Sequence, residues 1–512
     1  MKQIAHLMVM AVLLTLVATS AAMPHASWAA PAVPTRPFHT TGATAQQQSN
    51  SPIYLPLILG VGSSSSSPSP TPAPTSPIPT PTPPSNSGPG PFFLPNNANG
   101  VHNTTDPDVL IDAAGGMYVA YHDYAPVGDH QTAFYAYCAA GGTGGCTRAA
   151  DFTMITLDAV LQGNSVVDAN LALDPSGHPR MLITLLNDFL YAACDANCAN
   201  AANWTITQAI HYNGLSDYHS RRFAIDQQGQ PSFVYKDDNS RDHYGTWYAF
   251  CAATCSDAAQ WHETLIAKDA LTRPSLALTA DGHPRIAVSL PGPSDSQLLY
   301  MECNTTCSDG SQWSGVVFST INPFYSAYSL QVGTDNLPRL AVSPYEVENS
   351  FFQSHRLYYL ACTTACGDGT DNDWHGGDTG LTDEAGDAVS LALDSQNRPR
   401  IAYEATQNGS SGVMEYVTCD TACDTSSAIW KPQVFDSVAA LNASDPVTTT
   451  VICSNPTMPT WSLGYWASIA LDASGRPRIA YDAHHLWYCS YSNGAHVETD
   501  IAWARFAQVN QP

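Results

Sequence analysis

The segment LALDSQNRPRIAY, Leu391 to Tyr403, recurs along the chain and decides the fold. An apolar triplet precedes an Asp-containing turn, and a Pro-Arg pair opens a second apolar run. Related copies are LALDPSGHPRMLIT from Leu171, FAIDQQGQPSFVY from Phe223, LALTADGHPRIAV from Leu276, LQVGTDNLPRLAV from Leu330, IALDASGRPRIAY from Ile469 and a degenerate first copy, VLIDAAGGMYVAY, from Val109. A repeat spacing of roughly fifty residues is typical of propeller blades and not of helical solenoids.

Most copies are followed by a Tyr-rich apolar run that ends in a cysteine pair, with a Trp several residues later. The runs are FLYAACDANC before Trp204, TWYAFCAATC before Trp261, LLYMECNTTC before Trp313, LYYLACTTAC before Trp374 and VMEYVTCDTAC before Trp430. The first repeat has the wider pair Cys138 and Cys146, and the last repeat lacks the pair.

These segments predict one four-stranded antiparallel blade per unit. The apolar triplet is strand A, buried on both faces between blades and therefore without polar alternation. Asp and Gly form a tight turn, and Pro opens strand B, where the first residue need not donate. The Tyr-rich run is strand C and the Trp region strand D. Seven units predict an all-β, seven-bladed β-propeller closed in a ring, with Phe92–Leu94 or Trp503–Val509 filling its outer edge.

Three parts are predicted along the chain. Residues 1–30 have the pattern of a signal peptide, because Lys2 precedes the apolar run Leu7–Val17 and small residues follow it. Residues 31–91 are rich in Pro, Ser and Thr and predict an extended linker. Its apolar island, Ile53–Leu59, is either a surface anchor or a sticky piece of linker. Residues 92–512 form the propeller.

The composition excludes some partners. Acidic residues outnumber basic ones by 44 to 19, and the formal charge of -25 argues against nucleic acid and anionic membranes. No later run approaches the ~18 apolar residues of a membrane span. We therefore expect a secreted or cell-surface monomer with no transmembrane segment in the mature chain, whose partner is an extracellular glycan or protein.

The fourteen cysteines fit an oxidising compartment. They are either metal or redox sites or disulfides across each C-to-D turn. The pairs recur at equivalent places and the histidines are not spaced as zinc partners, which favours disulfides. The predicted pairs are Cys138–Cys146, Cys194–Cys198, Cys251–Cys255, Cys303–Cys307, Cys362–Cys366, Cys419–Cys423 and Cys453–Cys489.

An arginine follows the repeat proline in five copies. It either clamps a ligand carboxylate or pairs with the turn Asp of its own or the adjacent blade. Recurrence in nearly every blade favours the structural role. The residues are Arg180, Arg285, Arg339, Arg400 and Arg478.

The Asp-x-x-Gly-x-Pro turn within four-stranded repeats resembles secreted bacterial β-propellers of the broad sialidase-like and BNR-repeat group, from Asp106 to the C-terminus. The sialidase Asp-box, Ser-x-Asp-x-Gly-x-Thr-Trp, has no clean copy here. Arg221, Arg222 and Arg273 are the candidates for a sialidase arginine triad, but the first two are adjacent and would point to opposite faces of a strand. No activity motif is therefore transferred.

Propeller architecture implies a site on the face formed by the D-to-A and B-to-C connections. Aromatic rings, acids and a few arginines there suit sugars, although an ordinary polar rim would have the same residues. The candidates are His122, Asp123, Asp168, His219, Arg221, Arg273, Tyr328, Asp387, Tyr465, Trp466 and Asp482. If the chain were a propeller lyase, His122, His219 and Tyr328 would be the trial acid and base.

One loop suits calcium. Asp368, Asp371 and Asp373 offer hard oxygen ligands at short spacing, without the closing Glu of an EF-hand. No other cofactor is expected.

The first functional hypothesis is a non-catalytic extracellular propeller that binds glycan or protein at its rim. The alternative is a carbohydrate-active enzyme on the same fold, a sialidase-like hydrolase or a polysaccharide lyase, and a purely structural surface protein is the third. The sequence leaves open whether the chain is an enzyme, because the fold alone does not select a function.

Overall fold

The computed structural model describes residues 90–95, 104–123, 132–140, 145–157, 166–212, 221–238, 243–269, 272–290, 297–318, 327–343, 346–348, 351–353, 356–381, 384–407, 410–444, 460–491 and 494–509. The chain divides into two units at Ser76, and every described residue lies in the second unit. The predicted signal peptide and all but the last two residues of the predicted linker lie outside the description, so the boundaries at 30 and 91 stay predictions.

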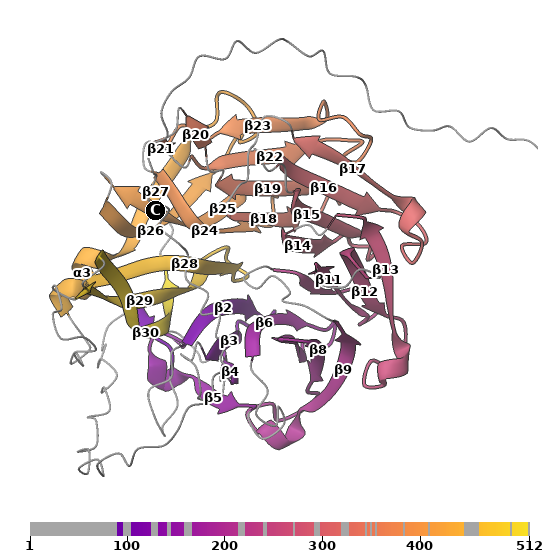
Figure 1. Ribbon diagram of the computed structural model, residues 1–512, viewed down its shortest axis with the longest axis horizontal. Helices are drawn as coiled ribbons and strands as arrows, with labels where there is room; N and C mark the ends of the chain where they lie inside the picture. Colours follow the sequence, from indigo (N-terminus) through magenta and orange to yellow (C-terminus); the bar gives the residue numbers. More distant parts are fainter. Residues whose placement is uncertain are drawn as a thin grey trace, which may run out of the picture. The chain divides into compact units, whose positions relative to one another are not determined.

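Seven four-stranded antiparallel sheets make up the described part, which confirms the seven-bladed β-propeller (Figure 1). In chain order they are blade 1, β2 (Thr104–Ile111), β3 (Met117–Asp123), β4 (Ala133–Cys138) and β5 (Thr153–Thr156); blade 2, β6 (Val166–Leu173), β7 (Pro179–Leu185), β8 (Asp188–Ala193) and β9 (Thr205–His211); blade 3, β10 (Phe223–Ile225), β11 (Pro231–Asp237), β12 (Gly245–Cys251) and β13 (Trp261–Ala267); blade 4, β14 (Thr272–Leu278), β15 (Pro284–Leu290), β16 (Gln297–Cys303) and β17 (Trp313–Phe318); blade 5, β18 (Ala327–Val332), β19 (Pro338–Ser343), β22 (Tyr358–Cys362) and β23 (Trp374–Asp378); blade 6, β24 (Glu384–Leu393), β25 (Pro399–Gln407), β26 (Ser410–Cys419) and β27 (Trp430–Ser437); and blade 7, β28 (Thr460–Leu471), β29 (Pro477–Tyr491), β30 (Gly494–Gln508) and β1 (Phe92–Phe93).

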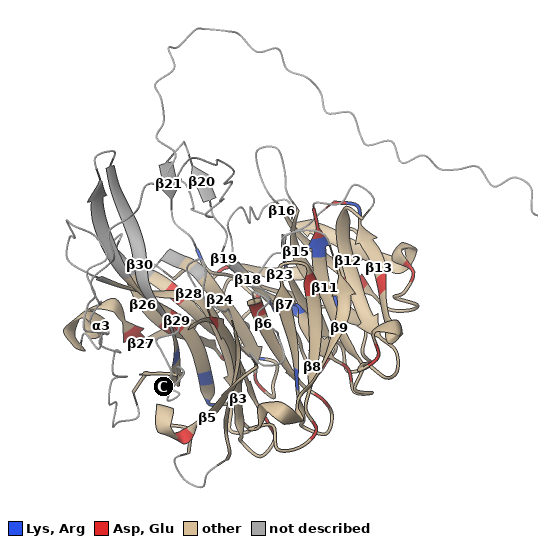
Figure 2. Ribbon diagram, turned by 60° about the horizontal axis from the view of Figure 1, so that its bottom comes forward, with Lys and Arg blue, Asp and Glu red and all other residues tan. Residues whose placement is uncertain are grey.

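Small elements decorate the blades. They are the hairpin β20 (Glu346–Glu348) and β21 (Phe351–Gln353) in blade 5, the helix α3 (Val438–Ser444), and the 3-10 turns η1 (Ala149–Asp151), η2 (Ala201–Asn203), η3 (Ala258–Gln260) and η4 (Gly310–Gln312). None of the described helices is long and apolar enough to cross a membrane. Charged residues are thinly spread over the described ribbon (Figure 2), in keeping with a charged fraction of 12%.

The innermost strands form a closed ring. Each strand A contacts the strand A of both neighbouring blades, and β28 of blade 7 contacts β2 of blade 1. These strands are apolar because they are packed between blades, and the repeat proline opens strand B in six blades.

The chain ends meet in blade 7. Phe92 pairs with Phe506 and Phe93 with Arg505, so β1 is the outermost strand beside β30. The amide of Leu94 adds a hydrogen bond of 2.8 Å to the carbonyl oxygen of Ala504. Of the two predicted closures, the one by Phe92–Leu94 is therefore right, and Trp503–Val509 lies largely in the third strand, β30.

A disulfide closes the C-to-D turn of each of blades 1 to 6, and the Trp that follows the turn in blades 2 to 6 packs on the preceding blade. Six of the seven predicted cysteine pairs are bonded, as expected for exposed turns in an oxidising compartment. The pair of Cys453 and Cys489 lies outside the described side chains. Each following Trp packs on a Tyr of the preceding blade at 4.9–5.5 Å between ring centroids; these pairs are Tyr135–Trp204, Tyr191–Trp261, Tyr248–Trp313, Tyr300–Trp374 and Tyr359–Trp430.

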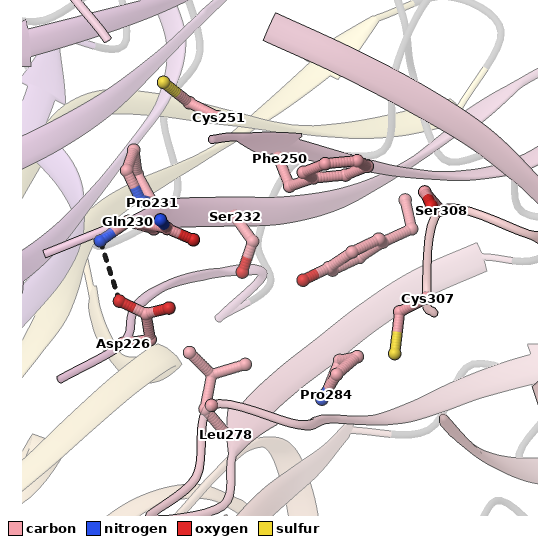
Figure 3. A pocket seen from close by; sticks show the side chains of 12 residues that line it. Asp226, Gln230, Pro231, Ser232, Phe250, Cys251, Leu278, Pro284, Cys307 and Ser308 are labelled. Carbon is pink, nitrogen blue, oxygen red and sulfur yellow. Dashed lines mark hydrogen bonds between the residues drawn. The ribbon is translucent and has the colours of Figure 1, made fainter. Parts of the chain in front are cut away.

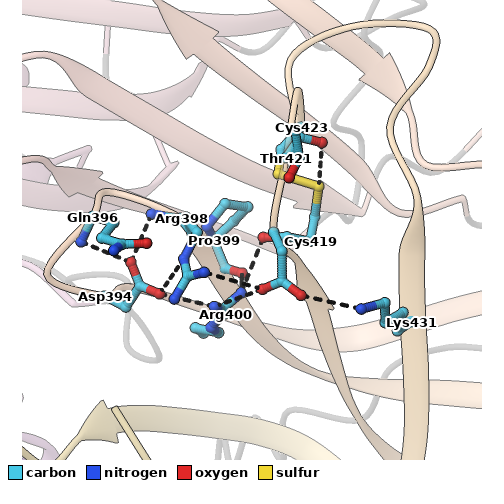
Figure 4. Close-up of polar contacts among 10 residues, drawn as sticks. Asp394, Gln396, Arg398, Pro399, Arg400, Cys419, Thr421, Cys423 and Lys431 are labelled. Atoms are coloured by element: carbon cyan, nitrogen blue, oxygen red, sulfur yellow. Dashed lines mark hydrogen bonds and ion pairs between the residues drawn. A yellow bond between two sulfur atoms is a disulfide. The ribbon is translucent and has the colours of Figure 1, made fainter. Parts of the chain in front are cut away.

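The repeat arginine ties two turns of its own blade together (Figure 4). In blade 6, Asp394 Oδ1 accepts from the amides of Gln396 at 2.9 Å and Arg398 at 3.0 Å, which closes the A-to-B turn. Arg400 then donates to Asp394 Oδ2 at 2.8 Å and to the carbonyl oxygen of Cys419 at 3.0 Å. The predicted structural role of this arginine is confirmed.

Candidate functional site

The candidate site is built where the inner strands begin, at the end opposite the Asp turns. The register of strand A shifts there in blades 1, 2, 4, 6 and 7. Such bulges turn a side chain away from the regular alternation. Asp106 and Arg273 adopt positive φ values of 55° and 49° within them, a conformation uncommon for residues other than glycine.

A belt of serines follows the bulges along the inner strands. Ser275, Ser329, Ser390 and Ser468 each precede the apolar triplet of their strand A, and each Oγ accepts from a backbone N–H of the next blade at 2.8–3.1 Å. Blade 1 has Asp108 at this position, and its Oδ2 accepts from the amide of Leu171 at 2.9 Å. The repeat is thus polar at this level in every blade, but blades 1 and 3 place a charge there.

Arg221 and Arg222 point to different partners, as adjacent residues of a strand should. Arg221 of blade 3 reaches past blade 2 to Asp108 Oδ1 at 3.0 Å and to the Oγ of Ser468 in blade 7. Arg222 is fully buried and donates to Asp168 Oδ2 at 2.7 Å. Two of the three arginines predicted for a sialidase triad, Arg221 and Arg222, therefore hold blades together.

His122 of β3 forms a buried pair with Asp106. Its Nε2 lies 2.7 Å from Asp106 Oδ2, and its Nδ1 lies 3.1 Å from the carbonyl oxygen of Asp123. Burial alone would lower the pKa of His122, but the hydrogen bond to Asp106 and the charges of Asp106 and Asp168 outweigh it and raise that pKa above its ordinary value. Because a carbonyl oxygen only accepts, both ring nitrogens donate in the charged form.

A second acidic group joins blades 1 and 7. The fully buried Asp482 accepts at Oδ2 from Thr105 Oγ1, at 2.7 Å, and lies 3.1 Å from His484 Nε2. Its Oδ1 accepts from the backbone amide of Trp466 at 3.0 Å. Thr105 also lies 3.4 Å from Asp106 Oδ1, so the two His–Asp pairs form one network.

Trp466 and Arg273 complete this group. The Arg273 guanidinium of blade 4 lies over the Trp466 ring of blade 7, 5.7 Å from its centroid. Both side chains are partly exposed, whereas Asp106 and Asp482 are buried. We name the following residues the mouth cluster: Thr105, Asp106, His122, Arg273, Trp466, Asp482 and His484.

The structure brings some predicted residues together and separates others. His122, Arg273, Trp466 and Asp482 meet in the mouth cluster, with Asp123 beside it through its carbonyl oxygen. Asp168 and Arg221 lie in adjoining ion pairs. Tyr328 instead packs with the apolar residues between blades 4 and 5. His219 and the side chains of Asp387 and Tyr465 lie outside the description, and the prediction for them stays open.

Sequence reasoning did not single out Thr105 and Asp106. Their signal is the segment TTDPD, which is polar at the entry of a strand whose first six residues are buried. Polar residues in a strand with no exposed face need internal partners.

The proposed calcium residues belong to the C-to-D turn of blade 5. Asp368 Oδ1 accepts from the amide and hydroxyl of Thr370 at 2.9 Å, and Asp373 Oδ1 accepts from Thr364 at 2.5 Å. Among the described residues, the group whose side chains lie close enough to hold a metal ion is in blade 2 and comprises Asp174, His178 and Asp195. Arg180 bridges those two carboxylates at 2.6 Å each, so the group is an ion-pair cluster. Calcium at residues 368–373 stays a prediction.

Comparison with known proteins finds distant structural similarity and no family. No protein-family model and no curated protein matches the chain. Similar solved structures include the NanB sialidase of Streptococcus pneumoniae, with 12% identity, a TM-score of 0.40, and 81% of this chain and 70% of that one covered. A leech intramolecular trans-sialidase has 11% identity, a TM-score of 0.39 and coverage of 82% and 69%. The polysaccharide lyase Uly1 has 8% identity, a TM-score of 0.32 and coverage of 82% and 93%.

Proposed function

We propose that this protein is an extracellular β-propeller that binds a glycan at the mouth cluster without cleaving it. The proposal rests on one observation. Asp106, His122 and Asp482 are buried and hold internal partners, while Trp466 and Arg273 are partly exposed.

The engaged atoms weigh against acid–base catalysis. Both ring nitrogens of His122 have partners, and Asp106 Oδ2 and both oxygens of Asp482 accept hydrogen bonds or pair with His. A general base needs an atom within hydrogen-bond reach of a substrate proton. A retaining glycosidase needs two carboxyl groups about 5–5.5 Å apart that can reach the glycosidic bond. Groups held in place by internal partners serve better as a rigid bed for a ligand.

The exposed atoms suit a sugar. An indole offers an apolar face for the C–H side of a pyranose ring and an N–H donor at its edge. The Arg273 fork can donate to ring hydroxyls or to a carboxylate. Both groups stand on inner strands, which are rigid parts of the ring, so little ordering free energy is lost on binding.

The extracellular location is supported by the six disulfides, which persist in oxidising compartments and are rare in the cytosol.

A glycan array tests the proposal together with an assay for newly formed reducing or unsaturated sugar ends. We expect retention of one glycan class with no release of product. Trp466→Ala should weaken retention about tenfold or more, the size typical of an aromatic hot spot. Ile429→Ala is the matched control, because this residue is 70% exposed on the C-to-D turn of blade 6.

If the wild type releases sugar ends and Asp482→Asn does not, the protein is an enzyme and the binding proposal is wrong. Retention that is equal in wild type and Trp466→Ala would move the site away from the mouth cluster.

A further inference from the structure

The propeller contains a guanidinium site that its own repeat normally fills. In blade 2, Arg180 donates to the carbonyl oxygens of Pro179 at 3.1 Å and Cys194 at 2.7 Å, and to Asp174 Oδ2 at 2.6 Å. Arg400 of blade 6 makes the same three kinds of contact (Figure 4). The fold therefore builds one acceptor set, consisting of a turn carboxylate, a proline carbonyl and a cysteine carbonyl.

Blade 3 keeps the acceptors and lacks the donor. Its repeat reads FAIDQQGQPSFVY, with Ser232 where the arginine stands in other blades. Asp226 still closes the turn, because its Oδ1 accepts from the amides of Gln228 at 2.9 Å and Gln230 at 2.8 Å. Its Oδ2 has no hydrogen bond or ion pair with the described residues. Ser232 is only 4% exposed, and its side chain lies near Tyr248, which also lines this place.

A pocket of about 230 Å³ lies at this place, between blades 3 and 4 (Figure 3). Asp226, Pro231 and Cys251 line it, and they correspond to the three partners of Arg180 in blade 2. Phe250 and Leu278 supply apolar walls. At about 30 Å³ of liquid per water, the volume exceeds that of a single ordered water several-fold.

The other blades with a described turn fill or remove this site. In blade 1, Tyr118 takes the position of the arginine and donates to Asp112 Oδ2 at 2.8 Å. In blade 4, Thr279 replaces the turn Asp, and Arg285 fills the site by donating to the carbonyl oxygens of Pro284 and Cys303 and pairing with Glu302 at 3.6 Å. In blades 5 and 7 the arginines pair with acids of their own turns. Among the described turns, blade 3 differs from the others. Its turn carboxylate, Asp226, contacts neither an arginine nor a tyrosine of the repeat, and a pocket lies beside it.

We propose that this pocket binds the guanidinium group of an arginine side chain supplied by another polypeptide. The planar fork of arginine matches a carboxylate oxygen and two carbonyl oxygens set at its edge, which are the contacts that Arg180 and Arg400 make. Phe250 and Leu278 receive the aliphatic stem. The net charge of -25 attracts cationic segments to the protein as a whole. Lysine, a point charge without the fork, fits the acceptor set less well.

Isothermal titration of the full-length protein tests this proposal with three probes: butylguanidinium, the peptide acetyl-Gly-Arg-Gly-amide, and its lysine counterpart. We expect the arginine peptide to bind at least about tenfold more tightly than the lysine peptide, one factor of ten being about 1.4 kcal/mol. Tight binding of butylguanidinium and not of the arginine peptide would show a small-molecule site and overturn the assignment to a polypeptide ligand.

Two variants remove the site in different ways. Ser232→Arg installs the repeat's own arginine, so it should abolish binding of the arginine peptide and raise the melting temperature. Asp226→Asn retains the turn acceptor and removes the charge, so binding should weaken about tenfold, as for other charge-assisted pairs. Unchanged binding in Asp226→Asn overturns the proposal even if Ser232→Arg does not fold.

Arg180→Ser provides the matched gain of function. It should open an equivalent pocket in blade 2, lower the melting temperature, and recover part of that loss when butylguanidinium is added. The conservative variant Arg180→Lys, which keeps a charge in the site, should show no such recovery. Failure of butylguanidinium to restore Arg180→Ser, together with equal binding by wild type and Ser232→Arg, would leave the proposed acceptor set without support.

Discussion

Replacing Arg400 by Met should destabilise the propeller far more than replacing its neighbour Arg398 by Met. Both side chains contact the same oxygen, Asp394 Oδ2, at 2.8 Å and 2.7 Å. Arg400, however, is 3% exposed and also holds the carbonyl oxygen of Cys419, whereas Arg398 is 36% exposed. Each variant therefore removes one arginine from the same carboxylate, a buried arginine in one case and a largely exposed one in the other.

The expected magnitudes follow from burial. Removing Arg400 should cost about 3–5 kcal/mol, because it takes a buried charged partner from Asp394 and leaves the buried carbonyl oxygen of Cys419 without its arginine donor. Losing an exposed pair costs about 0–1 kcal/mol. Unfolding entropy is about 2.1 cal/mol/K per residue, or ~0.9 kcal/mol/K for roughly 420 residues, so a loss of ~4 kcal/mol lowers the melting temperature by about 4–5 °C. Arg398→Met should lower it by about 1 °C or less.

Differential scanning calorimetry at pH 7 measures both variants beside the wild type. The burial of Asp394 acts to raise its pKa, but amide hydrogen bonds and the arginines outweigh this and lower the pKa below its ordinary value, so the carboxylate is charged at pH 7. Equal melting temperatures for the two variants would refute the reasoning, because the buried arginine would then contribute no more than an exposed one.

Three further perturbations test other parts of the structure. Reductant should lower the melting temperature without changing the circular dichroism below the transition, because each short disulfide loop contributes about 2 kcal/mol; an unchanged melting temperature would argue against the bridges. His122→Asn should cost most stability in mild acid, since a raised folded pKa stabilises the native state fully below about pH 6.5 and this contribution disappears as the pH rises through the folded value. A stability difference from the wild type that stays constant with pH would contradict the charged pair with Asp106. Phe93→Ala should cost about 3–5 kcal/mol and speed proteolysis of the amino-terminal strand, because Phe93 is buried against Trp461 and under the guanidinium of Arg505. Unaltered proteolysis would show that β1 does not hold the ring closed.

The blade itself could be predicted from the sequence, because the determining interactions are local. A turn Asp bonds amides two and four residues later, as Asp394 does, and a proline two residues past the turn's Asn or Gly opens the next strand. A cysteine pair four residues apart closes a turn with little backbone movement. Such features recur wherever the same letters recur, so seven copies of the pattern predicted seven blades.

The mouth cluster required the closed ring. Thr105 and Asp482 are 377 residues apart, and the neighbouring ion pair of Arg221 with Asp108 joins residues 113 apart. The sequence nominated His122, Arg273, Trp466 and Asp482 from their place in the connections, but no spacing could pair them. Their directions depend on bulges in the inner strands, and a bulge forms only when the neighbouring strand sets the register.

The pocket of blade 3 shows the same division. The sequence alone determines that Ser232 breaks the Pro-Arg pattern, since the exception is visible in the letters. Only the tertiary structure decided that the exception is a cavity, because blade 4 had to pack beside it without filling the space. Local hydrogen bonding is determined by nearby residues along the chain, whereas the volume left by a missing side chain depends on every neighbour that surrounds it.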